Sequence, residues 1–500
     1  MQTNNLLGTP VLVVGAGIMG AGIAQVAAQA GHPVMLLDAR AGAAQAAKAK
    51  LTQSLEMLVT KGKISADAAA QTLARIAPVA SLHDASTAGL VVEAVVESLD
   101  VKRALFQQLE SVVGADCILA TNTSSISVTA IAHGLQHPGR LVGMHFFNPV
   151  PLMKLVEVVS GLQTNPAVAQ SIFALSQHWG KTPVHARSTP GFIVNRIARP
   201  FYAETLALLH EQAATPAVLD ACWRAAGFRM GPCELMDLIG HDTNFAVTQS
   251  VFEANFYDKR YVPSLLQREM VDGGLLGRKS GQGFYAYGAD VAKIEARVFQ
   301  EIPFPVVQTL CLHGQGAIAD LLASRLHDLG QAFSRKLDAK GTALEIDGQT
   351  LRLTDGSSAS SWGPKTAVFD WPQSPAPGAA LAWAPARAAH PDWVALAGQC
   401  LQALGFAAQQ ISDVPGLVVA RTVAMLINEA SDAVHQGVCS PEAADDAMRL
   451  GVNYPQGPFQ WLAQWGAPDV VHLLDQLDQH YRGERYRVSP GLRHAVWRNL

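Results

Sequence analysis

A histidine and a glutamate that lie close together in the sequence are the residues of this chain best suited to moving a proton. His145 follows one apolar run, 141–144, and Glu157 lies at the centre of another, 155–159. A carboxylate inside a buried strand is costly to desolvate without a partner, and the turn-forming Asn148 and Pro149 send the chain back between the two runs. A histidine oriented by a carboxylate is a frequent general base near neutral pH. The alternative interpretation is a core histidine beside an unrelated ion pair.

A glycine-rich turn near the start of the chain is arranged to hold a dinucleotide. The apolar run 11–14 leads directly into this turn, and a helix-forming run, 21–30, follows it. Glycines permit a tight turn and the close approach of a pyrophosphate, whose charge meets the positive end of the helix. The residues predicted to contact the cofactor in this turn are Gly15, Gly17, Ile18, Met19 and Gly20.

An aspartate at the end of the next apolar run indicates which dinucleotide is bound. Asp38 follows the run 33–37, where a second parallel strand is expected. A carboxylate there can accept hydrogen bonds from the ribose hydroxyls and repels a 2′-phosphate, so NAD is favoured over NADP. Arg40 keeps NADP as the alternative.

Three further apolar runs end in polar clusters. The run 90–96 closes with Glu97, the run 117–120 closes with the polar residues 121–124, and the run 141–144 closes with His145. In an open doubly wound sheet, ligands lie outside the carboxyl ends of the strands. We therefore expect all three clusters to face the cofactor, which weakens the purely structural interpretation of His145.

Five motifs in this region resemble the 3-hydroxyacyl-CoA dehydrogenase family. They are TNTSS at 121–125, HFFNPVP at 145–151, KLVEV at 154–158, PGFIVNR at 190–196 and GQGFY at 281–285, and the likeness covers residues 10–286. The resemblance implies an enzyme that oxidises an (S)-3-hydroxyacyl-CoA thioester reversibly to the 3-oxoacyl-CoA with NAD. It also implies that His145 is the base, that Glu157 orients it, and that Ser124 and Asn195 hold the reacting oxygen.

The same resemblance assigns binding residues. It places NAD beside Asp38, Glu97, Lys102, Asn148 and Lys279, and the CoA thioester near Ser54, Lys61 and Ser124. For Lys61 and its neighbouring lysines, a solvated helix face is the alternative. The resemblance further implies a role in fatty-acid β-oxidation, hydroxybutyryl-CoA metabolism, or phenylacetate and adipyl-CoA catabolism. The alternative functions are a dehydrogenase of a 3-hydroxy acid without CoA and a non-catalytic NAD-binding protein, as in the related lens crystallins.

The second half of the chain repeats part of the first. PGFIVNR at 190–196 recurs as PGLVVAR at 415–421, and Glu204 recurs as Glu429, both at an offset of 225 residues. We predict an α/β protein of four domains: a Rossmann-like NAD-binding domain at 1–188, an all-α domain at 189–290, a reduced Rossmann-like domain at 291–410 and a second all-α domain at 411–500. The two all-α domains are expected to form a pseudo-dimer within one chain, which leaves homo-oligomerisation open.

The second copy lacks the residues expected to do chemistry. Ala382 and Ala420 stand where Glu157 and Asn195 would be repeated, so we expect one active site per chain. Gly314 and Gly316 echo the glycine-rich turn and are interpreted as a structural relic, with a second NAD site as the alternative. Residues 356–389, rich in Ser, Pro, Ala and Trp, are predicted to be the least ordered part.

The composition argues against several other classes of protein. A net charge of −4 over 500 residues shows no excess of basic residues of the kind that binds nucleic acid. No apolar run approaches the roughly 20 residues that span a bilayer, so no membrane association is expected. The six cysteines form no Cys-x-x-Cys pair and no zinc-like spacing with histidine. We therefore expect no metal site and a cytoplasmic protein.

Overall fold

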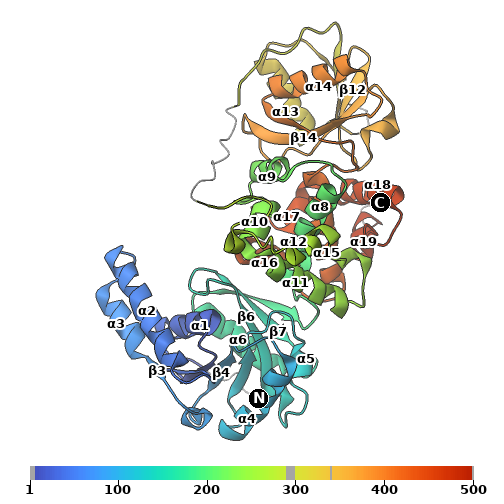
Figure 1. The fold of residues 1–500 in the computed structure, drawn as a ribbon. Helices are drawn as coiled ribbons and strands as arrows, with labels where there is room; N and C mark the ends of the chain where they lie inside the picture. Colours follow the sequence, from blue (N-terminus) through green and yellow to red (C-terminus); the bar gives the residue numbers. More distant parts are fainter. Residues whose placement is uncertain (1–5, 289–298, 338–340, 498–500) are drawn as a thin grey trace. The chain divides into compact units, whose positions relative to one another are not determined.

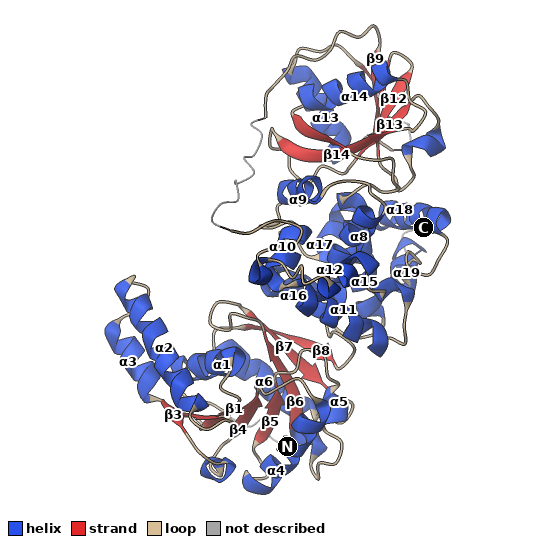
Figure 2. Cartoon of the chain, viewed as in Figure 1, coloured by secondary structure: helices blue, strands red, loops and turns tan. Residues whose placement is uncertain are grey.

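The computed structural model describes residues 6–288, 299–337 and 341–497, and Figures 1 and 2 show its helices and strands. The contacts between segments divide the chain into two compact units. The first unit contains residues 1–196 and 433–452, and the second contains residues 197–432 and 453–500. A short segment of the second half of the sequence therefore belongs to the unit built by the first half.

The first unit is built on an eight-stranded sheet of order β3-β2-β1-β4-β5-β6-β7-β8. All neighbouring strands are parallel except β6 and β7, which are antiparallel. Its strands are β1 (Val11–Val14), β2 (Val34–Leu37), β3 (Ile76–Pro78), β4 (Leu90–Glu93), β5 (Ile118–Thr121), β6 (Leu141–Phe146), β7 (Leu155–Ser160) and β8 (Thr182–Arg187). The central strands β1, β2 and β4 consist almost entirely of Val, Leu and Met, as expected where helices cover both faces of a parallel sheet. The predicted Rossmann-like domain is confirmed.

Helices connect these strands in the order expected for a doubly wound sheet (Figure 1). They are α1 (Ile18–Gln29), α2 (Ala43–Thr60), α3 (Ala66–Ala74), α4 (Leu99–Val112), α5 (Val128–Ile131) and α6 (Pro166–His178). Helix α1 begins at Ile18, within the glycine-rich turn at 15–20 and earlier than the predicted start at residue 21, and α4 begins just after Glu97. The turns that carry the predicted cofactor residues therefore lie at the carboxyl ends of β1 and β4.

The predicted all-α parts are confirmed as two groups of helices. The first group is α7 (Val194–Ile197), α8 (Arg199–His210), α9 (Pro216–Ala225), α10 (Pro232–Ile239), α11 (His241–Ala254) and α12 (Leu265–Asp272). The second group is α15 (Val419–His435), α16 (Pro441–Gly451), α17 (Pro458–Trp465), α18 (Ala467–Tyr481) and α19 (Pro490–Trp497). Proline occupies the first turn of α9, α10, α16 and α17, where a missing N–H costs no helical hydrogen bond.

A second, seven-stranded sheet lies between these groups in the sequence, in the order β10-β9-β11-β12-β13-β14-β15. Its elements are β9 (Leu310–His313), α13 (Ala317–Asp328), β10 (Ser334–Lys336), β11 (Ala343–Ile346), β12 (Gln349–Leu353), β13 (Thr366–Phe369), β14 (Ala379–Pro385), α14 (Pro391–Ala403) and β15 (Phe406–Gln410). The predicted reduced α/β part is confirmed. The expectation of low order at 356–389 is wrong, because β13 and β14 lie inside this stretch and bury Phe369, Leu381 and Trp383 in the core.

Each sheet carries a helix from the other repeat. In the first unit, α16 packs on β7 and β8, and in the second unit, α9 packs on β14. Helix α16 is the repeat of α9, and β14 is the repeat of β7, at the offset of 225 residues. The two repeats therefore exchange equivalent helices.

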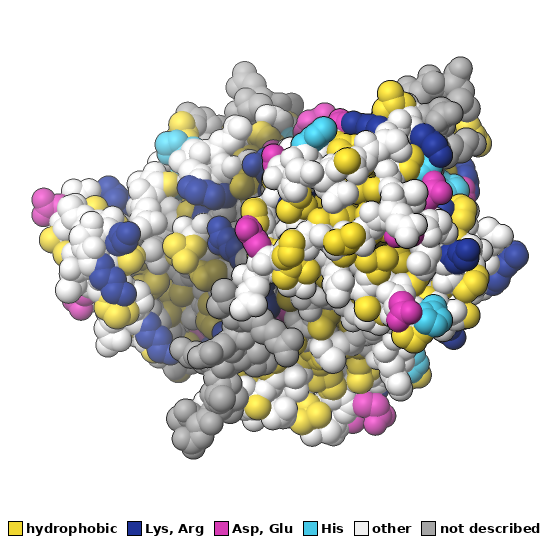
Figure 3. Space-filling model, turned by 90° about the horizontal axis from the view of Figure 1, so that it is seen from above, with side chains coloured by type: hydrophobic (Ala, Val, Ile, Leu, Met, Phe, Trp, Pro, Cys, Tyr) yellow, Lys and Arg dark blue, Asp and Glu magenta, His cyan; other side chains and the backbone are white. Residues whose placement is uncertain are grey.

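The surface carries charges of both signs. On the face shown in Figure 3, Lys and Arg side chains are interspersed with acidic and apolar side chains. Among the residues that the structure describes, no helix combines the length and the apolar character needed to cross a membrane.

Candidate active site

The two residues expected to move a proton face each other across β6 and β7. The antiparallel register pairs His145 with Glu157, and the ring Nδ1 of His145 lies 2.6 Å from Oε2 of Glu157. Glu157 is fully buried and His145 is only 5% exposed. A carboxylate at this distance holds the imidazole in one orientation and directs its other nitrogen, Nε2, away from β7.

The second oxygen of Glu157 connects this pair to the segment that carries Asn195. Oε1 of Glu157 accepts hydrogen bonds from the backbone N–H groups of Ile193 (3.0 Å) and Val194 (2.9 Å), at the start of α7. Nδ2 of Asn195 in turn donates to the backbone oxygen of Ser124 at 3.4 Å. The four residues predicted to be catalytic are therefore brought together in the first unit.

Aromatic side chains surround the histidine. The ring of His145 lies 4.5 Å from that of Phe147 and 5.9 Å from that of Phe192, measured between centroids. The backbone N–H of Phe146 donates to Oδ1 of Asn122 at 2.9 Å, which ties the end of β6 to the loop after β5. This apolar enclosure strengthens polar interactions at the imidazole by keeping water away.

Glu97 organises the loop that contains Ser124. Its Oε1 accepts from Oγ1 of Thr123 (2.7 Å) and from the N–H groups of Ser124 (2.9 Å) and Ser125 (3.2 Å). Its Oε2 lies 3.2 Å from Nζ of Lys102. Burial raises the pKa of Glu97, but the Lys102 ammonium and these donors outweigh burial, so its pKa lies below the usual value. Glu97 is therefore a carboxylate at neutral pH and holds the loop in one shape.

A further buried carboxylate, Glu93, interrupts the apolar run 90–96 and was given no role from the sequence. Its Oε1 lies 2.6 Å from Nζ of Lys102 and accepts from the N–H of Val95 (2.7 Å), while its Oε2 accepts from Oγ1 of Thr121 (2.6 Å). Glu93 and Lys102 are almost completely buried. The signal was available, because an acidic residue that interrupts an apolar run needs a buried partner. Lys102 therefore bridges Glu93 and Glu97 beneath the Ser124 loop.

The glycine-rich turn fits a dinucleotide. A Cβ at Gly15, whose φ is +106°, would lie 2.4 Å from the backbone oxygen of Ala94, and a Cβ at Gly20 would lie 1.7 Å from that of Gly15. At Gly17 a Cβ would meet nothing within 4 Å, which leaves open space above the turn. Ile18 is 78% exposed beside it, whereas Met19 packs partly against the core. The turn is therefore closed towards the sheet and open towards a ligand.

Asp38 is held at the edge of this turn. Its Oδ2 accepts from the N–H of Ala16 (2.8 Å), and its Oδ1 accepts from the N–H and Nε of Arg40 (2.9 and 3.2 Å). Burial raises the pKa of Asp38, but hydrogen bonds from Arg40 and Ala16 lower it below the usual value overall. A negative charge is therefore maintained where the ribose of a dinucleotide is expected.

The remaining predicted binding residues lie on the surface. Asn148 is exposed after β6, while Ser54 on α2 and Lys61 at its C-terminus are also exposed. Lys279 belongs to the second unit, where its ammonium pairs with Asp242. All four side chains are exposed, as a ligand-binding role requires.

In the second repeat, Asp370 stands where His145 would be repeated. Its carboxylate accepts from the N–H groups of Val418 (3.0 Å), Val419 (2.7 Å) and Ala420 (2.9 Å), at the start of α15. These donors are the repeats of Ile193, Val194 and Asn195. The second repeat therefore also has a buried carboxylate at the start of its helix, but this carboxylate belongs to an aspartate at the position equivalent to the histidine base.

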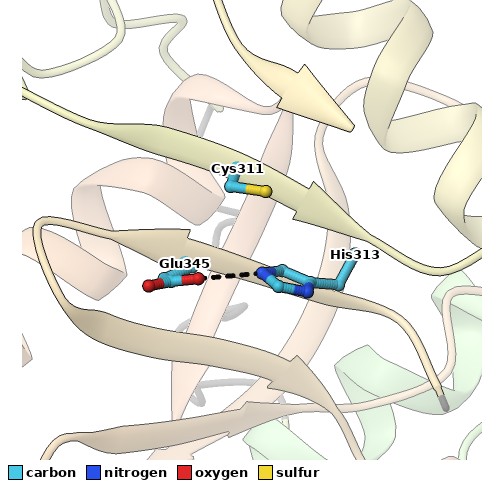
Figure 4. Close-up of side chains that lie close together, drawn as sticks. All are labelled: Cys311, His313 and Glu345. Atoms are coloured by element: carbon cyan, nitrogen blue, oxygen red, sulfur yellow. Dashed lines mark hydrogen bonds and ion pairs between the residues drawn. The ribbon is translucent and has the colours of Figure 1, made fainter. Parts of the chain in front are cut away.

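One group of potential metal ligands was missed because it comes from two strands. Cys311 and His313 on β9 and Glu345 on β11 have ligand atoms within 4.8 Å of one another, and Nε2 of His313 lies 3.0 Å from Oε2 of Glu345 (Figure 4). Nζ of Lys336 lies 4.0 Å from the same carboxylate oxygen. The ammonium competes with a metal ion for this oxygen, so an ion pair accounts for the cluster.

Three family models match this chain. Residues 10–189 match "3-hydroxyacyl-CoA dehydrogenase, NAD binding domain", and residues 191–287 and 416–499 match "3-hydroxyacyl-CoA dehydrogenase, C-terminal domain". Residues 351–415 match "3-hydroxybutyryl-CoA dehydrogenase reduced Rossmann-fold domain". The C-terminal model thus matches both repeats.

Individual relatives are similar over the whole chain or over its first part. The chain is 46% identical over 487 residues to the 3-hydroxyadipyl-CoA dehydrogenase of Escherichia coli strain K12, and this alignment covers 97% of this chain and 96% of the relative. It is 44% identical over 276 residues to a probable 3-hydroxybutyryl-CoA dehydrogenase of Deinococcus radiodurans, and this alignment covers 55% of this chain and 99% of the relative. A crystal structure of a 3-hydroxybutyryl-CoA dehydrogenase from Escherichia coli K12 matches with a TM-score of 0.87 and 43% identity, over 98% of this chain and 99% of that chain.

Proposed function

Because this chain belongs to the 3-hydroxyacyl-CoA dehydrogenase family, we propose that its His145–Glu157 pair carries out the proton transfer in the NAD-dependent oxidation of a 3-hydroxyacyl-CoA. The observation that carries this proposal is the 2.6 Å contact between Nδ1 of His145 and Oε2 of Glu157. In oxidation, Nε2 of His145 takes the proton of the substrate hydroxyl, and Glu157 stabilises the imidazolium that forms. In reduction, the protonated ring returns that proton.

Ser124 and Asn195 are proposed to hold the reacting oxygen. Their proposed role is supported by the 3.4 Å hydrogen bond between Nδ2 of Asn195 and the backbone oxygen of Ser124. Glu157 holds the segment that carries Asn195 by accepting from the N–H of Val194, and Glu97 holds the loop of Ser124 by accepting from the N–H of that residue. Groups held in this way keep the substrate oxygen oriented towards His145, which is the main contribution of positioning to catalysis.

When bound, NAD supplies the hydride acceptor for this reaction. We propose that the glycine-rich turn at 15–20 approaches its pyrophosphate, that Asp38 receives its ribose hydroxyls, and that Glu97, Asn148 and Lys279 complete the site. Lys102 would act through Glu97, since it is almost completely buried between two carboxylates.

The acyl-CoA substrate is proposed to have a short chain. The similar proteins are named for 3-hydroxyadipyl-CoA and for 3-hydroxybutyryl-CoA, and the full-length relative carries the former name. We therefore propose 3-hydroxyadipyl-CoA first and 3-hydroxybutyryl-CoA second. Ser54 and Lys61 are proposed to contact the CoA moiety from the exposed face of α2.

We further propose that the chain is organised as four domains, 1–188, 189–290, 291–410 and 411–500, in which the two all-α domains form an internal pseudo-dimer. Glu204 accepts from Nε of Arg485 and from the hydroxyl of Tyr486, each at 2.9 Å. Its repeat, Glu429, accepts from Nη1 of Arg260 (3.2 Å) and from the hydroxyl of Tyr261. Arg485 and Tyr486 are the repeats of Arg260 and Tyr261, so the two sets of contacts support a pseudo-twofold relation.

A cytoplasmic location is the last part of this proposal. All six cysteines are free, and Cys117, Cys222, Cys233 and Cys400 are buried. Buried, unpaired thiols are typical of proteins kept in a reducing compartment.

NADH oxidation tests the reaction and its substrate class together. The wild-type protein should reduce acetoacetyl-CoA and 3-oxoadipyl-CoA but not free acetoacetate, because the proposed site includes CoA contacts. The His145→Gln variant should lose about three orders of magnitude in kcat while binding NADH nearly as well, since general acid–base catalysis contributes roughly 10² to 10⁴-fold. Equal rates with acetoacetate, or a variant that retains a tenth of the activity, would refute the proposal.

A further inference from the structure

We propose that the second repeat completes the active site of the first, with Gln436 as a positioning residue for the segment that carries Asn195. This inference rests on the proposed function and adds a role for residues 433–452, which belong to the first unit. None of the residues predicted from the sequence to act in catalysis lies in this segment.

Helix α16 packs on the sheet beside the catalytic strand. Its buried residues are Ala444, Ala447, Met448 and Gly451, which lie on one face at helical spacing. The helix packs on β7, which carries Glu157, and on β8. Small residues on this face allow the helix to approach the sheet closely.

The end of α16 reaches residues adjacent to the proton-transfer pair. A Cβ at Gly451 would lie 2.6 Å from Cδ2 of Leu155, 3.1 Å from Cγ2 of Val194 and 3.7 Å from Cε1 of Phe147. Leu155 is two residues before Glu157 on the same strand, and Phe147 packs against the His145 ring. The close approach at Gly451 therefore supports the side chains immediately around the catalytic residues.

The turn before α16 contacts the same region through polar groups. Oε1 of Gln436 accepts from Nη1 of Arg196 at 2.9 Å, and the backbone oxygen of Val438 accepts from the N–H of Arg187 at 2.9 Å. Burial, and after it the negative charge of Glu157, raises the pKa of the Cys439 thiol to about 12. The turn therefore lies beside the carboxylate that orients His145.

Asn195 is consequently held from two sides. On its N-terminal side, the N–H groups of Ile193 and Val194 bind Glu157 from the first repeat. On its C-terminal side, the guanidinium of Arg196, which is only 4% exposed, binds Gln436 from the second repeat. Removing the second contact should let this short helix shift, which would misplace the Asn195 amide relative to His145.

The chain contains a matched contact that lacks a catalytic residue. Arg421 is the repeat of Arg196 and Glu211 is the repeat of Gln436, and Nη2 of Arg421 lies 3.4 Å from Oε1 of Glu211. The residue before Arg421 is Ala420, which has no amide to position. Loss of the contact between Arg421 and Glu211 should therefore not affect the chemistry.

The test compares three variants of the full-length protein with 3-oxoacyl-CoA and NADH. Gln436→Ala should lower kcat about tenfold, because a misplacement of about 1 Å can cost on the order of 10²-fold and only part of that shift is expected here. The dissociation constant of NADH should change less than about twofold, since Gln436 does not contact the glycine-rich turn. Gln436→Glu should restore most of the activity, because a carboxylate also accepts from Arg196. Glu211→Ala should leave kcat within about twofold of wild type.

Several outcomes would overturn the inference. Gln436 is exposed, so its replacement should not prevent folding, and thermal unfolding of each variant checks this. An unchanged kcat in Gln436→Ala, an equal loss in Glu211→Ala, or a failure of Gln436→Glu to recover activity would each remove the positioning role. An inactive wild-type protein would instead refute the proposed function.

Discussion

Replacing Glu157 by glutamine isolates the role of its negative charge, because the side chain keeps its shape. In the wild type, a carboxylate can only accept, so the 2.6 Å contact places a proton on Nδ1 of His145 and leaves Nε2 free as the base. In the variant, the N–H groups of Ile193 and Val194 hold the amide oxygen, as they now hold Oε1. The amide NH₂ then donates to Nδ1, and the ring proton moves to Nε2.

This change of tautomer should be severe. A comparable substitution in a Ser-His-Asp triad lowers kcat by about 10⁴-fold. We expect a loss of about 10³ to 10⁴-fold in kcat with acetoacetyl-CoA, which corresponds to roughly 4 to 5.5 kcal/mol of transition-state stabilisation at about 1.36 kcal/mol per tenfold change. NADH affinity, measured by fluorescence titration, should change less than about twofold.

Asp370→Asn is the matched control for Glu157→Gln. It makes the same change at the buried carboxylate of the second repeat, where no histidine is present to be reoriented. Its kcat should stay within about twofold of wild type. A Glu157→Gln variant with more than a tenth of the wild-type kcat, or an equal loss in Asp370→Asn, would refute the argument that Glu157 acts through the tautomer of His145.

Three further predictions concern cofactor choice, pH and the second repeat. The wild type should prefer NADH to NADPH, and Asp38→Ser should erase or reverse this preference in steady-state rates, whereas equal rates in the wild type would contradict it. Burial raises the pKa of Asp370 to about 6 from 3.8 in the unfolded chain. The folded state therefore binds the Asp370 proton more tightly than the unfolded chain does, and the resulting contribution to the free energy of unfolding should be lost as pH rises from about 4 through 6. Urea unfolding at a series of pH values should show this loss in the wild type and not in Asp370→Asn. A chain that ends at Tyr287 should aggregate or dimerise in analytical ultracentrifugation, because Glu204 would lose Arg485 and Tyr486, and a soluble, fully active monomer would contradict the proposed pseudo-dimer.

The fold and the candidate site of the first unit could be predicted because its site residues directly follow the apolar strands that position them. Strands such as 11–14 are continuous in apolar residues, and each is followed by the glycines or polar residues that a ligand requires. His145 and Glu157 are brought together by two adjacent strands, so a turn between two apolar runs was sufficient to predict their contact. Local signals of this kind do not depend on distant parts of the chain.

The parts that could not be predicted depend on distant contacts. Strand β14 has the sequence AALAWAP, and alanine has a low intrinsic preference for strands, so its place in a sheet depends on pairing with β13 and β15. The contact between Gln436 and Arg196 joins residues that are 240 positions apart. Cys311 and Glu345 meet only because β9 pairs with β11. Periodicity and spacing carry no information about such pairings.

The second repeat has preserved the anchoring of its first helix while losing the base. The start of a buried helix leaves backbone N–H groups that need acceptors, and Glu157 provides one in the first repeat. With Ala382 at the equivalent position, the acceptor in the second repeat is Asp370, which occupies the place of the histidine. The helix held in this way, α15, ends at His435, directly before Gln436. A repeat that retains this anchor without catalytic residues is what we expect if its function is to hold Gln436 and α16 against the active site of the first.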